Sequence, residues 1–329
     1  MNPRSAIRAV SALCIGVATL VSAPSALALD KVRVTAIQGT QLFPVRIMQS
    51  AGIAAKHGLE LDVKGVAGPQ ALYTILQTND FEVAFGGWVS IALMRAKGFK
   101  FTNVFSMISF TNEIMVKNDS PYKSIADLKG KRVGLFGGPT AATSWLFRIL
   151  AVKKFGFDPV KDIKIKYGAP PLLVGMLDRG DLDAILILDP FITRLMETGN
   201  YRSVGTVGKL WNETTGQNPM LVAVTVYEPW AKSNPDIVRR FVAAFKEAMI
   251  YLKEHPDSWA PQAKKMGIKT DKGVRMLYER TAPAFITTFD QKLIDDQLAY
   301  AAEIIKAFGP QGDVPSKIPQ GTFDLSYVK

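Results

Sequence analysis

A glycine turn before a helix is the feature of this sequence best suited to hold a ligand. Val133 to Phe136 is a short apolar run, Gly137-Gly138-Pro139 interrupts it, and the apolar spacing becomes helical from Thr140. A strand, a turn and a helix in this order leave free backbone N–H groups at the helix start, where the dipole favours negative charge. With the hydroxyls of Thr140 and Thr143 beside them, these groups predict a site for an anionic or polar ligand head. The alternative is that the glycines serve only the turn.

Aromatic residues lie at or beside several turns of this kind and could hold the apolar part of an organic ligand. Most aromatic residues at such positions belong to the core, and a few exposed ones would be enough to form a clamp. The candidates are Phe43, Phe85, Trp88, Phe110, Phe136 and Phe191. Arg46 and Arg148 lie one to two turns into a predicted helix, and each either reaches an anion or faces solvent.

The residues needed for catalysis are missing from the sequence. His57 and His255 are its only histidines, neither is near a predicted ligand turn, and no Asp or Glu shares a metal-ligand spacing with them. The single cysteine, Cys14, lies in an N-terminal segment that we expect to be removed, which excludes a thiol nucleophile and a thiolate metal site. We find no GxSxG, HExxH or P-loop motif. The sequence therefore predicts a binding protein without cofactor or metal, and not an enzyme.

Residues 1–28 have the features of a secretory signal peptide. Arg4 and Arg8 precede an apolar run from Val10 to Val21, and Ala26-Leu27-Ala28 is a cleavage site with small residues at its ends. The run is shorter than the roughly 20 residues that a membrane span needs, so we expect an exported chain. The formal net charge of +11 is spread along the sequence, without a run of five like charges. We therefore expect no nucleic-acid partner.

Two halves of the chain repeat the same order of predicted elements. The first half comprises strands at 32–37, 59–66, 81–85 and 101–108 with helices at 44–56, 69–77 and 90–97. The second comprises strands at 133–136, 163–167 and 184–188 with helices at 140–154 and 172–178. The segment LQTNDFEVA from Leu76 aligns with LDRGDLDAI from Leu177. This pseudo-repeat predicts two α/β lobes, each built from a βαβαβ unit.

Further helices are expected towards the C-terminus. Asn234 as cap and Pro235 as first residue predict the start of a helix whose apolar face comprises Val238, Phe241, Phe245, Met249 and Leu252. A second amphipathic helix is predicted at 291–307, with an apolar face of Leu293, Ile294, Leu298, Ala301, Ile304 and Ile305. The tail after Gly309 is rich in Pro and Gly, and we expect it to be extended.

The turns after the strands are the predicted ligand contacts. Right-handed crossovers place the carboxyl ends of parallel strands at one edge of each sheet, and ligands of open α/β sheets bind there. Two such edges facing each other would form a cleft. The residues expected in it are Gln38, Gln41, Phe43, Gly68, Gly87, Trp88, Gly138, Thr140, Thr143, Asp189 and Phe191.

Four stretches of the sequence carry a family resemblance. They are SIADLKGKRVG from Ser124, in which Ser124 and Asp127 form a capping box, HGLELDVKGVAGP from His57, NDFEVAFGG from Asn79, and GDLDAILILDPF from Gly180. From Leu29 to at least Tyr251 the chain resembles periplasmic solute-binding proteins of ABC importers, of the sulfonate, taurine and nitrate type that includes pyrimidine-precursor binders. The family often has Glu or Gln where this chain has Asp189.

The resemblance implies a two-lobed periplasmic binding protein fold of type II with two hinge segments. The lobes expected from it are 29–112 for the first part of lobe I, 113–218 for lobe II, and 219–329 for the return to lobe I and the C-terminal helices. Asn112 and Asn218 lie in the hinges and join the expected ligand contacts. The implied partners are a small-molecule ligand and an inner-membrane permease with its cytoplasmic ATPase, and we expect a periplasmic monomer.

The ligand that we expect is a small organic anion, such as a sulfonate, a taurine-like compound or an aromatic acid. Its acid group would lie at the start of the helix near Gly137 to Thr143, and its apolar part against Trp88, Phe85 or Phe191. Two alternatives stay open: a binder of a neutral pyrimidine or thiamine precursor, and an enzyme of the pyrimidine-synthesis type on the same fold. A sensor that presents its ligand to a receptor is equally compatible with the sequence.

Overall fold

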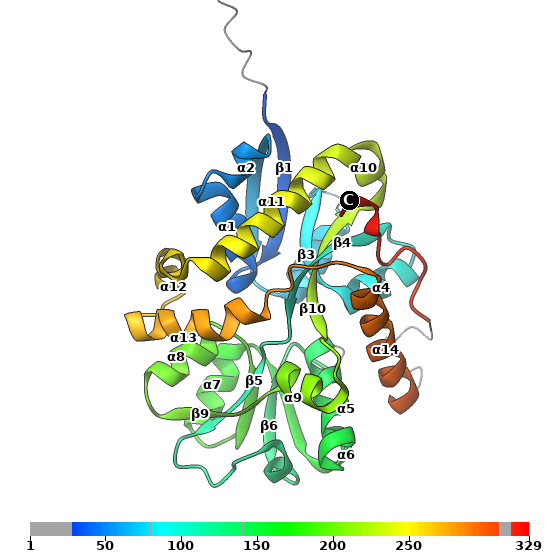
Figure 1. Cartoon of the computed structure of the whole chain (residues 1–329). Coiled ribbons are helices and arrows are strands. Elements are labelled where there is room, and N and C mark those ends of the chain that lie inside the picture. The colour runs from blue at the N-terminus through cyan, green and yellow to red at the C-terminus, as the bar shows by residue number, and fades with distance from the viewer. Residues whose placement is uncertain (1–27, 79, 140, 309–316, 329) are drawn as a thin grey trace, which may run out of the picture.

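Two five-stranded sheets form the centres of two lobes in the computed structural model, which describes residues 28–78, 80–139, 141–308 and 317–328 (Figure 1). The sheet of lobe I has the order β2 (Leu59–Val66), β1 (Asp30–Ile37), β3 (Val83–Gly87), β10 (Met220–Tyr227) and β4 (Phe101–Ser109). Strands β1, β2 and β3 run parallel, and β10 runs antiparallel to both of its neighbours.

The sheet of lobe II repeats this arrangement. Its order is β7 (Lys164–Gly168), β6 (Arg132–Phe136), β8 (Ala184–Ile187), β5 (Glu113–Lys117) and β9 (Tyr201–Thr206). Strands β6, β7 and β8 are parallel, and β5 is antiparallel to β8 and β9. The predicted strands and their repeat are confirmed, whereas β5 and β9 were not predicted. The predicted strand at 81–85 begins later and continues through Gly87, where a turn was expected.

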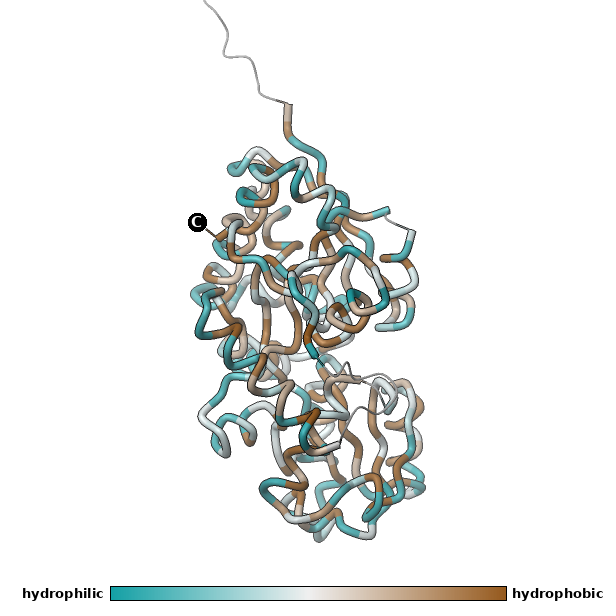
Figure 2. The backbone as a smooth tube through the Cα atoms, turned by 90° about the vertical axis from the view of Figure 1, so that its right-hand side faces the viewer, coloured by the Kyte–Doolittle hydropathy of each residue, from teal (hydrophilic) through white to brown (hydrophobic). Residues whose placement is uncertain are grey.

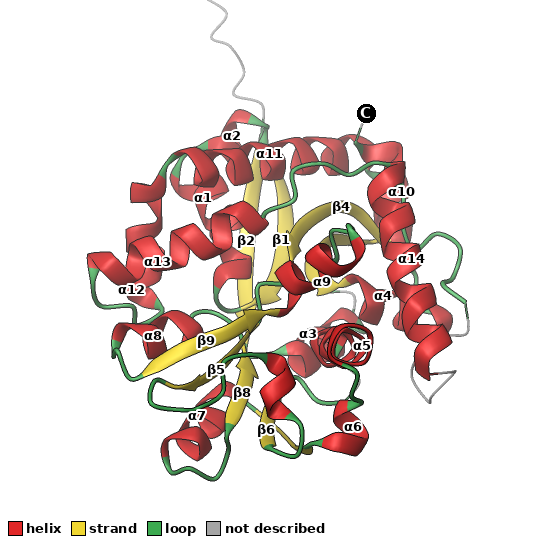
Figure 3. Cartoon of the chain, turned by 60° about the horizontal axis from the view of Figure 1, so that its bottom comes forward, coloured by secondary structure: helices red, strands yellow, loops and turns green. Residues whose placement is uncertain are grey.

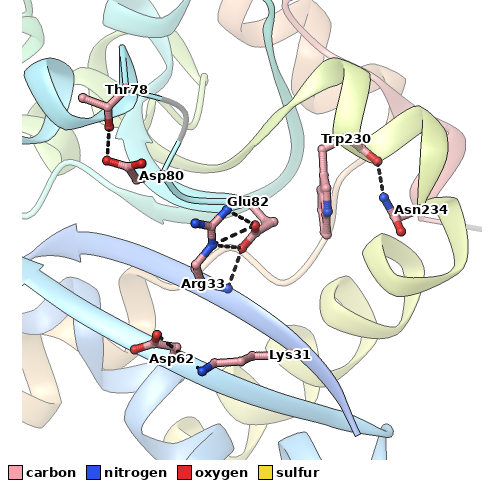
Figure 4. A network of polar contacts seen from close by, with 8 residues as sticks. All are labelled: Lys31, Arg33, Asp62, Thr78, Asp80, Glu82, Trp230 and Asn234. Atoms are coloured by element: carbon pink, nitrogen blue, oxygen red, sulfur yellow. Dashed lines mark hydrogen bonds and ion pairs between the residues drawn. The ribbon is translucent and has the colours of Figure 1, made fainter.

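An arginine in one strand forms an ion pair with a carboxylate just before the neighbouring strand at the same place in both lobes: Arg33 of β1 with Glu82, and Arg132 of β6 with Asp183. In lobe I the Arg33 N–H donates to Glu82 Oε2 over 2.7 Å and the Glu82 N–H donates to the Arg33 carbonyl over 3.1 Å (Figure 4). In lobe II the Arg132 N–H donates to Asp183 Oδ2 and the Asp183 N–H to the Arg132 carbonyl, both over 2.8 Å. These contacts fix the register at the amino ends of the strands, opposite the predicted ligand edge.

Helices flank both sheets (Figure 3). Those between the strands of lobe I are α1 (Phe43–Ser50), α2 (Ile53–Lys56), α3 (Pro69–Leu76) and α4 (Trp88–Ala96). Those of lobe II are α5 (Ala142–Phe155), α6 (Pro159–Asp162), α7 (Pro170–Asp178), α8 (Phe191–Glu197) and α9 (Val207–Thr215). The helix predicted at 44–56 is divided at Gly52, whose φ of +71° favours glycine and does not continue a helix.

The chain after β10 is helical. Its helices are α10 (Glu228–Ser233), α11 (Pro235–Glu254), α12 (Ala260–Lys265), α13 (Asp271–Thr281) and α14 (Gln291–Phe308). The predicted start of α11 at Pro235 is confirmed, but Asn234 does not cap it, because its side chain donates to the carbonyl of Trp230 (Figure 4). Among the described residues, no helix combines the length and the apolar composition needed to cross a membrane.

Burial of the apolar faces of helices stabilises each lobe. The hydrophobic stretches of the chain run through the interior of both lobes in Figure 2. In α11 the predicted apolar face is confirmed, since Val238, Phe241, Phe245, Met249 and Leu252 are all buried. Burial of each such side chain contributes about 1.5–3 kcal/mol to the free energy of unfolding. In α14 the prediction is wrong at Leu298, which is 39% exposed, and the buried residue is its neighbour Gln297.

The buried side chain of Gln297 forms hydrogen bonds with the backbone of the second hinge, around Asn218. Its Oε1 accepts from the Met220 N–H over 2.8 Å, and its Nε2 donates to the Asn218 carbonyl over 3.1 Å. The C-terminal segment covers the outer edge of β4 through a parallel bridge between Asn103 and Phe323. The tail that we expected to be extended after Gly309 lies outside the described residues up to 316.

Candidate functional site

The carboxyl ends of the parallel strands meet at the boundary between the lobes. Strands β1, β2 and β3 of lobe I are parallel, and so are β6, β7 and β8 of lobe II, so the carboxyl ends of each set lie at one edge of its sheet. The turns touch, because a Cβ placed on Gly39 would lie 3.9 Å from both the Asp189 carbonyl and Pro190 Cδ. The turn after β1 therefore faces the turn after β8, as the strand topology predicts for a site between lobes.

The start of α5 supplies free donors at this boundary. Gly137 and Gly138 have φ angles of +97° and +90°, and the first residue of the helix is Ala142. Among the described residues no side-chain hydrogen bond caps α5, and Ser144 Oγ donates to the Gly138 carbonyl over 2.7 Å, which holds the turn against the helix. Thr140, a predicted contact, lies outside the described residues. The uncapped N–H groups can donate hydrogen bonds to an anion.

Thr143 and Asn112 come together as predicted site residues. Thr143 Oγ1 donates to Asn112 Oδ1 over 3.4 Å, and the two residues are 6% and 2% exposed. The Asn112 carbonyl accepts from the Val207 N–H over 3.0 Å. Asn112 therefore links the first hinge to the helices of lobe II. Asn218, in the second hinge, is exposed.

The predicted ligand contacts of lobe I differ in their solvent exposure and in their hydrogen-bond partners. Gln38 is exposed, Gly68 is half-buried, and Gln41 has its Oε1 buried without a hydrogen-bond partner among the described residues. The N–H of Gly87 is already occupied, because it donates to Tyr73 Oη over 3.1 Å. Burial raises the pKa of Tyr73, so this hydroxyl stays neutral at ordinary pH.

The carboxylate of Asp189, an expected ligand contact, has partners within the protein at both of its oxygens. Oδ1 accepts from the Thr193 N–H over 3.0 Å and from Thr193 Oγ1 over 2.6 Å. Oδ2 lies 3.2 Å from Arg280 Nη2, which is also 2.9 Å from Glu113 Oε1. Sequence reasoning missed Arg280 and Glu113, because no motif joins residues so far apart in the chain.

Most of the predicted aromatic clamp belongs to the core. Phe43, Phe85, Trp88 and Phe110 are at most 2% exposed. Phe85 packs on Phe245 at 4.9 Å between ring centroids, and Trp88 on Phe323 at 5.4 Å. The expectation that Phe85 or Trp88 offers an exposed face to a ligand is therefore wrong, because Phe245 of α11 packs on the ring of Phe85 and Phe323 of the C-terminal segment packs on the ring of Trp88. Phe136 and Phe191 are half-buried.

Phe191 borders a pocket of about 680 Å³ between lobe II and the segment that joins α12 to α13. The Arg194 guanidinium lies 5.6 Å from the centre of the Phe191 ring. Burial, together with the hydrogen bond to Asp178, raises the pKa of Tyr201 to about 12. Lys269 and Thr270, before α13, also line the pocket. This pocket does not include the start of α5, so it is a separate feature from the anion site.

The two candidate arginines have partners other than a ligand. Arg148 makes a two-pronged ion pair with Asp158, at 2.8 Å and 2.7 Å, which lowers the pKa of the Asp158 carboxyl. Arg46 Nη1 donates to Gln49 Oε1 over 3.0 Å. His57 Nε2 lies 2.8 Å from Glu247 Oε2. The described residues contain no cluster of three His, Cys, Asp or Glu side chains arranged for a metal.

The chain is similar to known binding proteins. The taurine-binding periplasmic protein of Escherichia coli (strain K12) is 23% identical over 234 residues, which are 70% of this chain and 70% of that protein. The periplasmic aliphatic sulphonate binding protein SsuA from Escherichia coli has a TM-score of 0.71 at 19% identity, covering 87% of this chain and 96% of its own. The alkanesulfonate-binding protein SsuA from Xanthomonas axonopodis pv. citri, solved bound to MOPS, has a TM-score of 0.72 at 17% identity, covering 89% and 97%.

These likenesses confirm the expected periplasmic binding protein fold. The model of the family described as NMT1/THI5 like matches residues 40–259, which are more than half of the 329 residues. The chain therefore belongs to the NMT1/THI5-like family.

Proposed function

We propose that this protein is the extracytoplasmic solute-binding component of an ABC importer and captures a small organic anion between its lobes. The observation that carries the proposal is the uncapped start of α5 at the boundary where the strand ends of both lobes meet. An anion placed there receives backbone N–H groups and the positive end of the helix dipole. The permease and its ATPase would take the ligand from the closed protein.

A sulfonate is the acid group that we favour. The relatives named above bind taurine or alkanesulfonates, and one was solved with MOPS, a bulky sulfonate. Gln38 and Gln41 follow β1, Gly68 follows β2, and we propose that they contact the organic part. With Phe85 and Trp88 in the core, Phe191 and Phe136 are the aromatic residues that we propose to reach it.

Closure of the lobes around the ligand would supply the affinity. Two segments cross between the sheets, one from β4 to β5 through Asn112 and one from α9 to β10 through Asn218. Small rotations in such segments move whole lobes as rigid bodies. A ligand held by both lobes stabilises the closed arrangement by its differential affinity for it. We propose export to the periplasm, with cleavage after Ala28 detectable as an intact mass that begins at Leu29.

A thermal-shift panel tests the proposal. Taurine, alkanesulfonates, aromatic carboxylates, nitrate and uncharged pyrimidines would be compared at equal excess. At a hundredfold excess over Kd, binding stabilises the folded state by about 2.7 kcal/mol, which raises the melting temperature visibly. We expect organic anions to produce the shift. A shift with uncharged pyrimidines alone would favour the neutral-ligand alternative, and no shift with any compound would count against a sulfonate or related ligand.

A further inference from the structure

We propose that α13 is a clasp between the lobes, fixed to lobe I through Tyr278 and to lobe II through Arg280, and that this clasp controls how far the lobes separate. Its meaning for ligand release rests on the function proposed above. The clasp itself is argued from contacts at the two sides of one helix.

The lobe I side of α13 is held by Tyr278. Its hydroxyl donates to the Lys253 carbonyl near the end of α11 over 2.7 Å. Its ring meets Trp259 edge-on at 5.6 Å, and Trp259 in turn meets Phe43 of α1 edge-on at 5.0 Å. Trp259 is fully buried, so this side of α13 is part of the core of lobe I.

The lobe II side is held by Arg280, two residues further on. Nη2 lies 2.9 Å from Glu113 Oε1 in β5 and 3.2 Å from Asp189 Oδ2 in the turn after β8. Nη1 lies 2.9 Å from Met196 Sδ in α8. The side chains of Arg280, Glu113 and Asp189 are 15%, 9% and 1% exposed, so the ion pairs are largely removed from water.

Residues two positions apart on an α-helix point about 200° apart around its axis. Tyr278 and Arg280 therefore leave α13 on opposite sides, each toward a different lobe. The start of the helix is also tied to lobe II, because Glu197 Oε1 accepts from the Thr270 N–H over 3.0 Å and from Thr270 Oγ1 over 2.6 Å. Separating the lobes must break either the contacts of Tyr278 with lobe I or the contacts of Arg280 and Thr270 with lobe II, since α13 cannot move with both lobes.

The charges make the Arg280 attachment a strong one. Two buried carboxylates share one guanidinium, and loss of that cation would leave both without their counter-ion. Asp189 also belongs to the turn that faces Gly39 of lobe I. Arg280 is thus a positioning residue: it holds the lobe II turn at the ligand boundary without being a ligand contact.

Spin labels on the two lobes test the clasp without any ligand. Cys14→Ser removes the natural cysteine, and Gln77→Cys and Lys161→Cys place labels at exposed positions of lobes I and II. We expect Arg280→Gln to broaden the distance distribution and lengthen its mean by several Å compared with the parent. The matched control is Arg275→Gln, an exposed arginine on the same helix, which should leave the distribution unchanged.

A neutral variant keeps the test decisive if Arg280→Gln fails to fold. Combining Glu113→Gln, Asp189→Asn and Arg280→Met removes the charges together and leaves no buried ion unpaired. Broadening in this variant supports the clasp, and a distribution that coincides with the parent in every folded Arg280 variant overturns it. These outcomes are independent of ligand identity, so failure of the ligand panel would not affect them. For a ligand that does bind, we expect at least fivefold faster dissociation from Arg280→Gln than from Arg275→Gln, and equal rates would disconnect the clasp from release.

Discussion

Thr143 Oγ1 donates to Asn112 Oδ1 over 3.4 Å, and this contact joins the start of α5 to the first hinge. Both residues are buried, so water does not replace the bond when it is lost. The helix that we propose to bind an anion is therefore attached to the segment about which we propose that the lobes move. An anion bound at α5 can influence hinge closure through this bond.

Replacing Thr143 with Val should weaken both stability and binding. The change keeps the shape and leaves Asn112 Oδ1 without its donor, which costs about 1–3 kcal/mol of unfolding free energy. Thr143→Ser, which keeps the hydroxyl, is the control. Denaturant unfolding and calorimetric titration would measure the two effects, and a Val variant as stable as the Ser variant would show that this bond contributes nothing.

Gly138→Ala should reduce ligand affinity by more than its effect on stability explains. A residue with a Cβ at φ +90° costs about 1–2 kcal/mol, and the added methyl stands in the turn where the acid group would approach. Gly180→Ala is the matched control, because Gly180 has φ +78°, open space around it and a position before the amino end of β8, not after a carboxyl end. Equal losses of affinity in the two variants would remove this turn from the site.

Trp88→Phe should leave ligand affinity unchanged. The ring is fully buried against Tyr300 and Phe323, and its Nε1 has no hydrogen-bond partner in the described part of the chain. Loss of the indole N–H therefore breaks no bond, whereas Trp88→Ala should cost about 3–5 kcal/mol by opening a cavity. A tenfold weaker Kd in the Phe variant would restore Trp88 to the site.

The pair of Arg148 and Asp158 should make stability depend on pH. Arg148 lowers the pKa of Asp158 in the folded state below its ordinary 3.8, so the folded state favours the ionised carboxylate. This stabilisation is present above pH 3.8 and is lost as pH falls through the lower, folded-state pKa. Asp158→Asn should therefore be less stable than the parent at pH 7, with the gap closing in acid. A gap in unfolding free energy that persists unchanged below pH 3 would contradict this.

Local patterns predicted the α/β elements well and their tertiary surroundings poorly. LELDVKGV alternates as a strand should, and β2 occupies the predicted residues. Strand β5 was missed because EIMVK, buried at four of its five positions, has no alternation and follows a segment interpreted as hinge. The burial of Phe85 and Trp88 depends on Phe245, Tyr300 and Phe323, which are distant in sequence. No spacing rule links Arg280 to Asp189.

A structure of the protein with the ligand that produces the largest thermal shift tests the central claim most directly. We predict that its acid group lies within hydrogen-bond distance of the N–H groups at the start of α5, between the turn of Gly137 and Gly138 and the turn after β1. Residues from both lobes should contact the same ligand. A ligand found away from the start of α5, in the pocket lined by Arg194, Lys269 and Thr270, would contradict the account.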